Sequence, residues 1–225
     1  MKSKLRVISG HGGNDVGAVA GGHQELDLNI AAVLSFNDAA SREYKPHDVT
    51  VITYPKSDRD GNEILLEKIA QANAAGADQL LIEVHHNIGA PEPGMQVWYS
   101  QNAKQTAGDE TWLVLPIVTQ ELGFLIGQPV PTIESSRSRF GKLGILDDTI
   151  CTSILIEARN VDTVTGPDWE YSFGVALAKA MARYFGWPPA SEPPAPPAAP
   201  DPAAVAKLAT AKSLVAELAT KIAGL

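Results

Sequence analysis

The chain has little of what marks a disulfide-stapled, exported or membrane protein. Its single cysteine, Cys151, excludes an intrachain disulfide and is expected to be a small buried packing residue. No apolar run is long enough to span a bilayer, and the opening residues, 1–4, contain no apolar signal segment. We therefore expect a protein that is cytoplasmic on synthesis and stays there until another agent releases it.

Positive charge is also scarce. The chain carries 18 Lys and Arg against 26 Asp and Glu, which gives a formal net charge of -8 at pH 7. A nucleic-acid-binding protein would show a basic patch or stripe, so we expect no nucleic-acid partner. What the chain does have is 225 residues with 44% hydrophobic content, which is enough for one sizeable core.

Short apolar runs alternate with helical patterns along residues 1–187, which indicates an α/β fold. The apolar runs predict strands at 5–9, 49–54, 79–85, 95–100, 132–136 and 153–157. Apolar positions at spacings of three and four predict helices at 25–42, 63–75, 111–122 and 169–185. Strands this apolar are typical of a buried parallel sheet. The expected fold is a single twisted, mainly parallel sheet flanked by helices.

The composition changes after residue 187. Residues 188–202 are rich in proline and alanine, which predicts a stiff, extended linker. Residues 203–225 predict a C-terminal amphipathic helix, with Asp201 and Pro202 at its N-cap and first position. Its cationic apolar seam leaves three roles open: self-association, docking on the first domain and contact with a membrane surface. The seam and the lysines are Leu208, Ala211, Val215, Leu218, Ile222, Leu225, Lys207, Lys212 and Lys221.

Three of the predicted strands lead to side chains that handle metals or protons. The run at 5–9 leads through Gly10 to His11, the run at 79–84 leads to His85, and the run at 153–156 leads to Glu157. Open α/β sheets gather their ligands at the carboxyl ends of the strands. If these strands share a sheet, two imidazoles and a carboxylate converge on one edge, which is enough for a zinc site with a base beside it.

Glu25 is a third candidate ligand. It opens the predicted helix at 25–42, where a carboxylate also suits the helix dipole. The Gly-rich stretch at 11–18 cannot be a regular element, and its glycines let the chain fold back so that the helix start meets His11. His11, Glu25 and His85 would then form a His2Glu set that leaves a fourth zinc position for water.

Around these residues the sequence resembles the zinc-dependent N-acetylmuramoyl-L-alanine amidases of the type 3 family. The resemblance covers roughly residues 4–186, and its motifs occur in the family's order. Any one of these motifs is a weak signal, whereas the whole series in register is specific. The matching pieces are His11-Gly12-Gly13-x-Asp15-x-Gly17-Ala18, Glu25-x-Asp27-x-Asn29, Val51-x-Thr53 with Asp58, Ala72-Asn73, Val84-His85-x-Asn87, Gly94 and Leu155-x-Glu157.

The resemblance implies that residues 1–187 are a zinc amidase catalytic domain. Its zinc ligands would be His11, Glu25 and His85, and its catalytic residue would be Glu157. The implied partner is peptidoglycan, cut at the amide between N-acetylmuramic acid and L-alanine, and the implied cofactor is Zn²⁺. Because no signal segment is expected, we interpret the protein as a phage or prophage endolysin that degrades the cell wall after release.

The chain departs from the family pattern beside the presumed site, although no departure touches a presumed ligand. Tyr54-Pro55 stands where an arginine is usual, Glu83 where serine is frequent, and Ala158-Arg159 where Gly-Phe is frequent. Strand alternation predicts that Glu83 faces the same side as His85, where it would contact the imidazole or the substrate.

Five further residues carry weaker expectations. Arg159 is expected to hold a stem-peptide carboxylate; the alternative is that Arg159 and Glu83 form mutual or surface ion pairs worth little. His86 should face away from its neighbour His85 and lie at the rim or behind the ligands, and Asn87 is a candidate for the same setting or for substrate contact. His23 is expected to be exposed or to touch substrate, whereas His47 is expected at the surface.

Other functions remain open at this level. A Gly-rich turn after a strand can cradle phosphate, but the spacing at 11–18 fits neither Gly-rich fingerprint. The same metal set could serve another zinc peptidase or deacylase, or a host amidase that remodels the wall. A catalytically inactive wall-binding module is disfavoured, because binding alone needs no carboxylate such as Glu157 at that edge.

Overall fold

The computed structural model of the chain describes residues 1–103, 108–164 and 168–190. Its main sheet has six strands in the order β4-β1-β5-β8-β6-β7. The first four of these run parallel, β6 runs antiparallel to β8, and β7 runs parallel to β6. The strands are β1 (Lys4–Ser9), β4 (Val49–Ile52), β5 (Gln79–Asn87), β6 (Gln96–Tyr99), β7 (Thr132–Glu134) and β8 (Thr152–Asn160).

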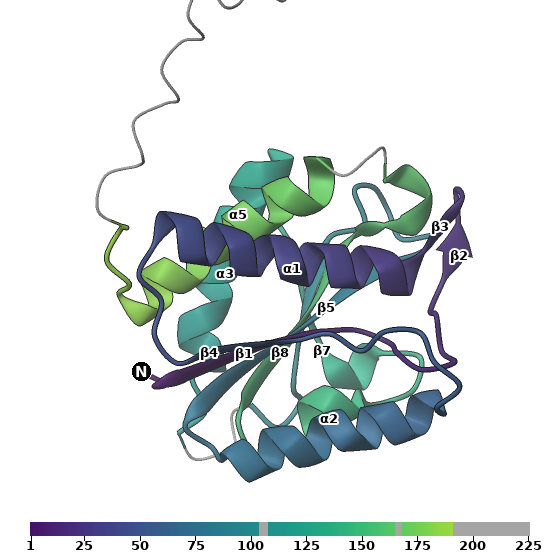
Figure 1. Cartoon of the computed structure of the whole chain (residues 1–225), viewed down its shortest axis with the longest axis horizontal. Helices are drawn as coiled ribbons and strands as arrows, with labels where there is room; N and C mark the ends of the chain where they lie inside the picture. Colours follow the sequence, from purple (N-terminus) through teal and green to yellow (C-terminus); the bar gives the residue numbers. More distant parts are fainter. Residues whose placement is uncertain (104–107, 165–167, 191–225) are drawn as a thin grey trace, which may run out of the picture. The chain divides into compact units, whose positions relative to one another are not determined.

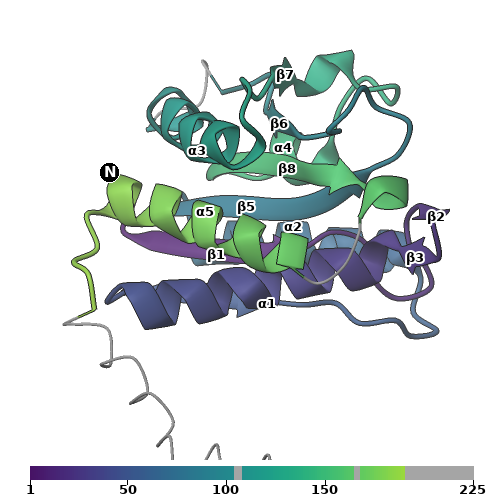
Figure 2. The same cartoon turned by 90° about the horizontal axis from the view of Figure 1, so that it is seen from above.

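Helices cover both faces of this sheet, as Figures 1 and 2 show. Helices α1, α3 and α5 lie on one face and share a core with alternate strand residues such as Ile82 and Ile154. Helices α2 and α4 lie on the other face. They pack against the strand residues that point to that side, such as Leu81 and Leu155. The helices are α1 (Glu25–Glu43), α2 (Gly61–Ala75), α3 (Thr111–Ile126), α4 (Gly144–Asp147) and α5 (Asp168–Phe185).

The register of the parallel strands brings the predicted site residues to one edge. Ser9, at the end of β1, pairs with Val84 of β5. The next residue of β5, His85, pairs with Glu157 of β8. Because β1, β5 and β8 are parallel neighbours, their carboxyl ends lie together. His85 and Glu157 lie in β5 and β8, and His11 follows shortly after β1.

The predicted α/β fold is confirmed, while several boundaries were wrong. The strand predicted at 49–54 ends at Ile52, because the amide of Tyr54 donates to the Ser9 hydroxyl (3.1 Å) instead of to a strand. The helix predicted from 63 begins at Gly61, because the Asp60 side chain caps it by accepting from the Asn62 and Glu63 amides. The helix predicted to end at 122 continues to Ile126.

Small elements were missed altogether. The hairpin of β2 (Val19–Ala20) and β3 (His23–Gln24) precedes α1, and two 3₁₀ turns, Ser135–Arg137 and Val161–Thr163, follow β7 and β8. Elements this short carry too few residues for a periodic pattern. The single-turn helix α4 was missed for the same reason.

The first compact unit of the chain spans Met1–Pro189. Of the linker predicted at 188–202, residues 191–202 lie outside the described residues, as does the helix predicted at 203–225. Within the described ranges, no helix is long and apolar enough to cross a membrane. Cys151 is buried at 3% exposure, as predicted.

Candidate active site

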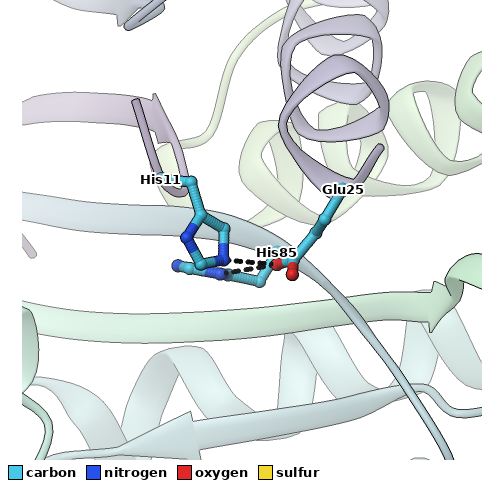
Figure 3. A group of neighbouring side chains, drawn as sticks. All are labelled: His11, Glu25 and His85. Atoms are coloured by element: carbon cyan, nitrogen blue, oxygen red, sulfur yellow. Dashed lines mark hydrogen bonds and ion pairs between the residues drawn. The ribbon is translucent and has the colours of Figure 1, made fainter. Parts of the chain in front are cut away.

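Three side chains converge where β1 and β5 end and α1 begins. Glu25 Oε1 lies 2.9 Å from His11 Nε2 and 2.9 Å from His85 Nδ1, which Figure 3 shows as dashed lines. The ligand atoms of the three residues all lie within 4.8 Å of one another. Among the described residues this is the one cluster of three or more such side chains that could hold a metal ion. Two imidazoles and one carboxylate form a donor set that suits zinc.

The Gly-rich loop between β1 and α1 brings Glu25 to the histidines. The Glu25 amide donates to the Ala18 carbonyl (2.8 Å), and the Ala18 amide donates back to Glu25 Oε2 (2.9 Å). His11 itself has a left-handed backbone with φ 57°, and Gly17 has φ 67°. A Cβ on Gly17 would lie 2.5 Å from Glu25 Oε2 and 2.6 Å from the His11 ring, so only glycine fits there.

The nitrogen on the far side of each imidazole faces a second carboxylate. Asp15 Oδ2 lies 2.8 Å from His11 Nδ1, and Glu83 Oε2 lies 3.2 Å from His85 Nε2. A carboxylate in this place fixes the ring orientation and the tautomer of a metal-binding histidine. The predicted orientation of Glu83 is confirmed. Asp15 was not among the predicted site residues, although its position four residues after His11 in the motif was a usable signal.

The electrostatics of the cluster favour bound positive charge. Burial opposes ionisation of Glu25, but hydrogen bonds to His11 and His85 outweigh it and hold the pKa of Glu25 far below its usual range. Burial likewise disfavours charged His85, yet the Glu83 charge and the hydrogen bond to Glu25 raise the pKa of His85 to about 10. Carboxylates that raise the affinity of the neighbouring histidines for a proton also favour a bound divalent cation.

Glu157 lies beside this cluster with one oxygen unpaired. It is the β8 partner of His85 in the sheet register, and its Oε2 is buried with no hydrogen-bond partner among the described residues. Burial raises the pKa of Glu157 to about 7, and the nearby His85 charge only partly offsets this rise. A carboxyl group with a pKa near neutrality can take up and release a proton at physiological pH.

The remaining candidates separate into buried and outer positions. His86 is buried at 2% exposure, which excludes the rim and leaves the other predicted place, behind the ligands; its ring faces α1, where Nδ1 lies 2.9 Å from Asn29 Oδ1. Its backbone amide still reaches Glu25 Oε1 at 3.3 Å. Arg159 is partly buried, bonds Thr163 through Nε (3.2 Å) and lies over the Trp169 ring.

The other three predicted residues have simpler surroundings. Asn87 is partly buried, and its side chain contacts the Ile88 amide at 2.9 Å. His23 is partly buried in β3, so the expectation of an exposed side chain was wrong. His47 is exposed, as predicted. Arg159 and Glu83 do not pair with each other in the described contacts, since Glu83 pairs with Lys68 of α2 (2.9 Å), a residue that sequence reasoning missed.

Comparison with known proteins assigns the chain to a family. The Amidase_3 family model, described as N-acetylmuramoyl-L-alanine amidase, matches residues 6–168. The chain belongs to this family. Among curated relatives, the chain is 35% identical to N-acetylmuramoyl-L-alanine amidase CwlM of Bacillus licheniformis over 86 residues. This aligned stretch covers 38% of the chain and 32% of CwlM. The chain is 30% identical over 126 residues to the uncharacterized protein YqiI of Bacillus subtilis (strain 168), which is 52% of this chain and 57% of that protein.

Solved structures of amidases share the fold of the amidase-family chain. An N-acetylmuramoyl-L-alanine amidase from Clostridium difficile 630 aligns with TM-score 0.64 at 20% identity, over 83% of this chain and 98% of that one. The catalytic domain of CwlV from Bacillus (Paenibacillus) polymyxa var. colistinus aligns with TM-score 0.62 at 17% identity, over 81% and 98%. Because a fold hosts many functions, these likenesses establish the architecture, while the activity has to be argued from the site.

Proposed function

We propose that the protein is a zinc-dependent hydrolase that cuts the amide between N-acetylmuramic acid and L-alanine in peptidoglycan. The observation that carries this proposal is the convergence of His11, Glu25 and His85 beside Glu157 in a chain of the amidase family. The two imidazoles and the carboxylate would hold the ion. When bound, zinc supplies Lewis acidity, which polarises a carbonyl and lowers the pKa of water.

The residues of the chain then divide the remaining work. Glu25 and the two histidines bind the ion, while Asp15 and Glu83 orient the rings of His11 and His85. Glu157, with its Oε2 unpaired among the described residues, accepts a proton from the attacking water. The same atom later gives the proton to the departing amine of L-alanine, which leaves as a neutral group.

The experiment is digestion of purified peptidoglycan by the full chain, followed by mass analysis of the products. We expect stem peptides with a free L-alanine amino terminus and glycan strands without new reducing ends. Chelator should abolish the activity, and added zinc should restore it. Cleavage within the stem peptide would favour a different zinc peptidase on this fold, and new reducing ends would exclude an amidase.

We also propose an endolysin role for this activity, as expected from the sequence, with host wall remodelling as the alternative. An endolysin made in the cytosol lyses cells only when another agent opens the membrane. Expression of the chain should therefore leave cells intact until the membrane is permeabilised, and the Glu157→Gln variant should not lyse them even then. Slow changes in cell separation without any permeabilisation would favour the remodelling role.

A further inference from the structure

A buried lysine lies behind the two histidines. Lys68 of α2 is 3% exposed, and its ammonium group donates three hydrogen bonds: to the Ser9 carbonyl (2.7 Å), the His11 carbonyl (2.9 Å) and Glu83 Oε1 (2.9 Å). An ammonium group has three donors, so all of them are used. Burying a charge is costly unless it is paired and hydrogen-bonded, and Lys68 meets both conditions.

Glu83 continues this contact to the second histidine. It is 3% exposed, and while Oε1 accepts from Lys68, Oε2 lies 3.2 Å from His85 Nε2. The other ring nitrogen of His85, Nδ1, faces Glu25, which in turn faces His11. The contacts therefore close a ring that runs from the His11 backbone through Lys68, Glu83, His85 and Glu25 back to the His11 side chain.

The backbone of His11 needs this support. A left-handed conformation is unfavourable for a residue other than glycine, because its Cβ approaches the following carbonyl oxygen, and His11 has φ 57°. The hydrogen bond from Lys68 to the His11 carbonyl restrains this conformation. The packing leaves little slack, because a Cβ on Gly10 would lie 2.5 Å from the His85 ring.

We infer that Lys68 and Glu83 are positioning residues that set the separation of the two histidines and present Nδ1 of His85 to the metal. Glu83 accepts a hydrogen bond from Nε2–H, which leaves Nδ1 of His85 free to bind. Lys68 neutralises Glu83, so that this carboxylate orients the ring instead of competing as a ligand. The inference rests on the proposed zinc site and on the orienting role of Glu83 given with it, and it adds Lys68, which acts on both histidines without being a ligand.

The test measures the metal site itself. Zinc affinity by chelator competition and the visible spectrum of the cobalt-substituted full chain are compared in Glu83→Gln, Lys68→Met and the double variant. Loss of an outer partner typically lowers metal affinity by roughly 10–100-fold. We expect each single variant to show such a loss with an altered cobalt spectrum. The fold-loss of zinc affinity in the double variant should be smaller than the product of the two single fold-losses, since Lys68 acts on His85 through Glu83.

A matched control separates positioning from general stability. Glu121 is also buried, at 4% exposure, and pairs with Lys179 (2.9 Å) and Arg183 between α3 and α5. Glu121→Gln should lower the melting temperature but leave zinc affinity and the cobalt spectrum unchanged. If Glu83→Gln also left the zinc affinity and the cobalt spectrum unchanged, the inference would be overturned. Glu83→Gln keeps nearly the same shape, so it decides the test alone if Lys68→Met does not fold.

The inference and the proposed function fail in different ways. Zinc affinity and the cobalt spectrum are measured without peptidoglycan. A wild-type chain that binds zinc but releases no L-alanine-ended peptides would overturn the function, while the effects of Glu83→Gln on the metal would still support positioning. A wild-type chain that binds no zinc would overturn both.

Discussion

At the scale of single residues, three side chains decide whether the site holds zinc. Glu25 Oε1 lies within 2.9 Å of a nitrogen of each histidine, so the loss of any member leaves only two donors. We predict that His11→Ala, Glu25→Ala and His85→Ala each lose bound zinc and activity, as measured by metal analysis of the purified protein. His86→Ala is the control and should retain zinc, because its ring faces Asn29. If His86→Ala lost zinc and His85→Ala retained it, His86 and not His85 would be the ligand.

Glu157 is expected to act as a base without holding the metal. Glu157→Gln should keep stoichiometric zinc and the fold, but lose about 10²-fold or more in kcat, the usual scale for such a group. Burial raises the pKa of Glu157 to about 7, and below that pH the group is protonated and cannot accept a proton. A bound zinc ion would lower this pKa, so the wild-type kcat/KM should rise with pH at or below neutrality, and this rise should vanish in the variant. Zinc loss in Glu157→Gln would identify Glu157 as a ligand instead.

Arg159 is expected to bind a carboxylate of the stem peptide. Its guanidinium group lies 4.7 Å from the Trp169 ring centroid and two residues beyond Glu157, which restrains it near the site. Arg159→Ala should raise KM on peptide-bearing substrate severalfold and leave zinc content unchanged. Steady-state kinetics on purified muropeptides check this, and an unchanged KM would remove the binding role.

At the scale of elements, the Gly-rich loop between β1 and α1 sets the geometry of the ligands. Gly17→Ala should lower zinc affinity, because the new methyl group would meet Glu25 and the His11 ring. Gly22→Ala is the matched control: Gly22 also has positive φ, 83°, but a Cβ there meets nothing within 4 Å. Both variants carry the backbone cost of a side chain at positive φ, roughly 1–2 kcal/mol, so equal zinc affinities would show that the contact with the ligands is unimportant.

The sequence predicted the elements that bear the site, because apolar runs between helical patterns mark parallel strands. The ends of those strands carry His11, His85 and Glu157, and the carboxyl-end rule places them together once the strands are neighbours. The sequence did not predict that β5 lies between β1 and β8, since strand order depends on packing between distant segments. Glu25 taken alone reads as an acid in the first turn of a helix, and its place in the family pattern, beside the Gly-rich loop, led to its prediction as a ligand.

What the sequence could not predict were contacts across elements. Lys68 lies in a helix whose pattern gives no sign that this lysine points inward to Glu83, so it would be expected at the surface. The orientation of Glu83 followed from strand alternation, but its partner did not. The buried position of His86 depends on how α1 covers the sheet, which residue spacing alone does not specify.

At the scale of the whole molecule, the compact unit should be independent of the rest of the chain. The Lys45 amide donates to the Pro188 carbonyl (2.9 Å), and Trp187 is buried at 4% exposure, so the cut should follow Ala190. We predict that residues 1–190 alone fold, bind zinc stoichiometrically and melt within a few degrees of the full chain. Circular dichroism and metal analysis check this. A much lower melting temperature would mean that the C-terminal segment stabilises the unit.

Removal of the C-terminal segment should change assembly or targeting instead. Most of the stability of a helix in a protein comes from packing of its apolar face, so the apolar seam predicted at 203–225 should find a partner. If the partner is a second copy, light scattering coupled to size exclusion should give the full chain a mass that is a whole-number multiple of its monomer, and residues 1–190 should be monomeric. If the partner is a membrane surface, the full chain should be monomeric and bind anionic vesicles at low salt through Lys207, Lys212 and Lys221. A monomer that ignores vesicles would exclude both roles and leave docking on the chain's own first unit.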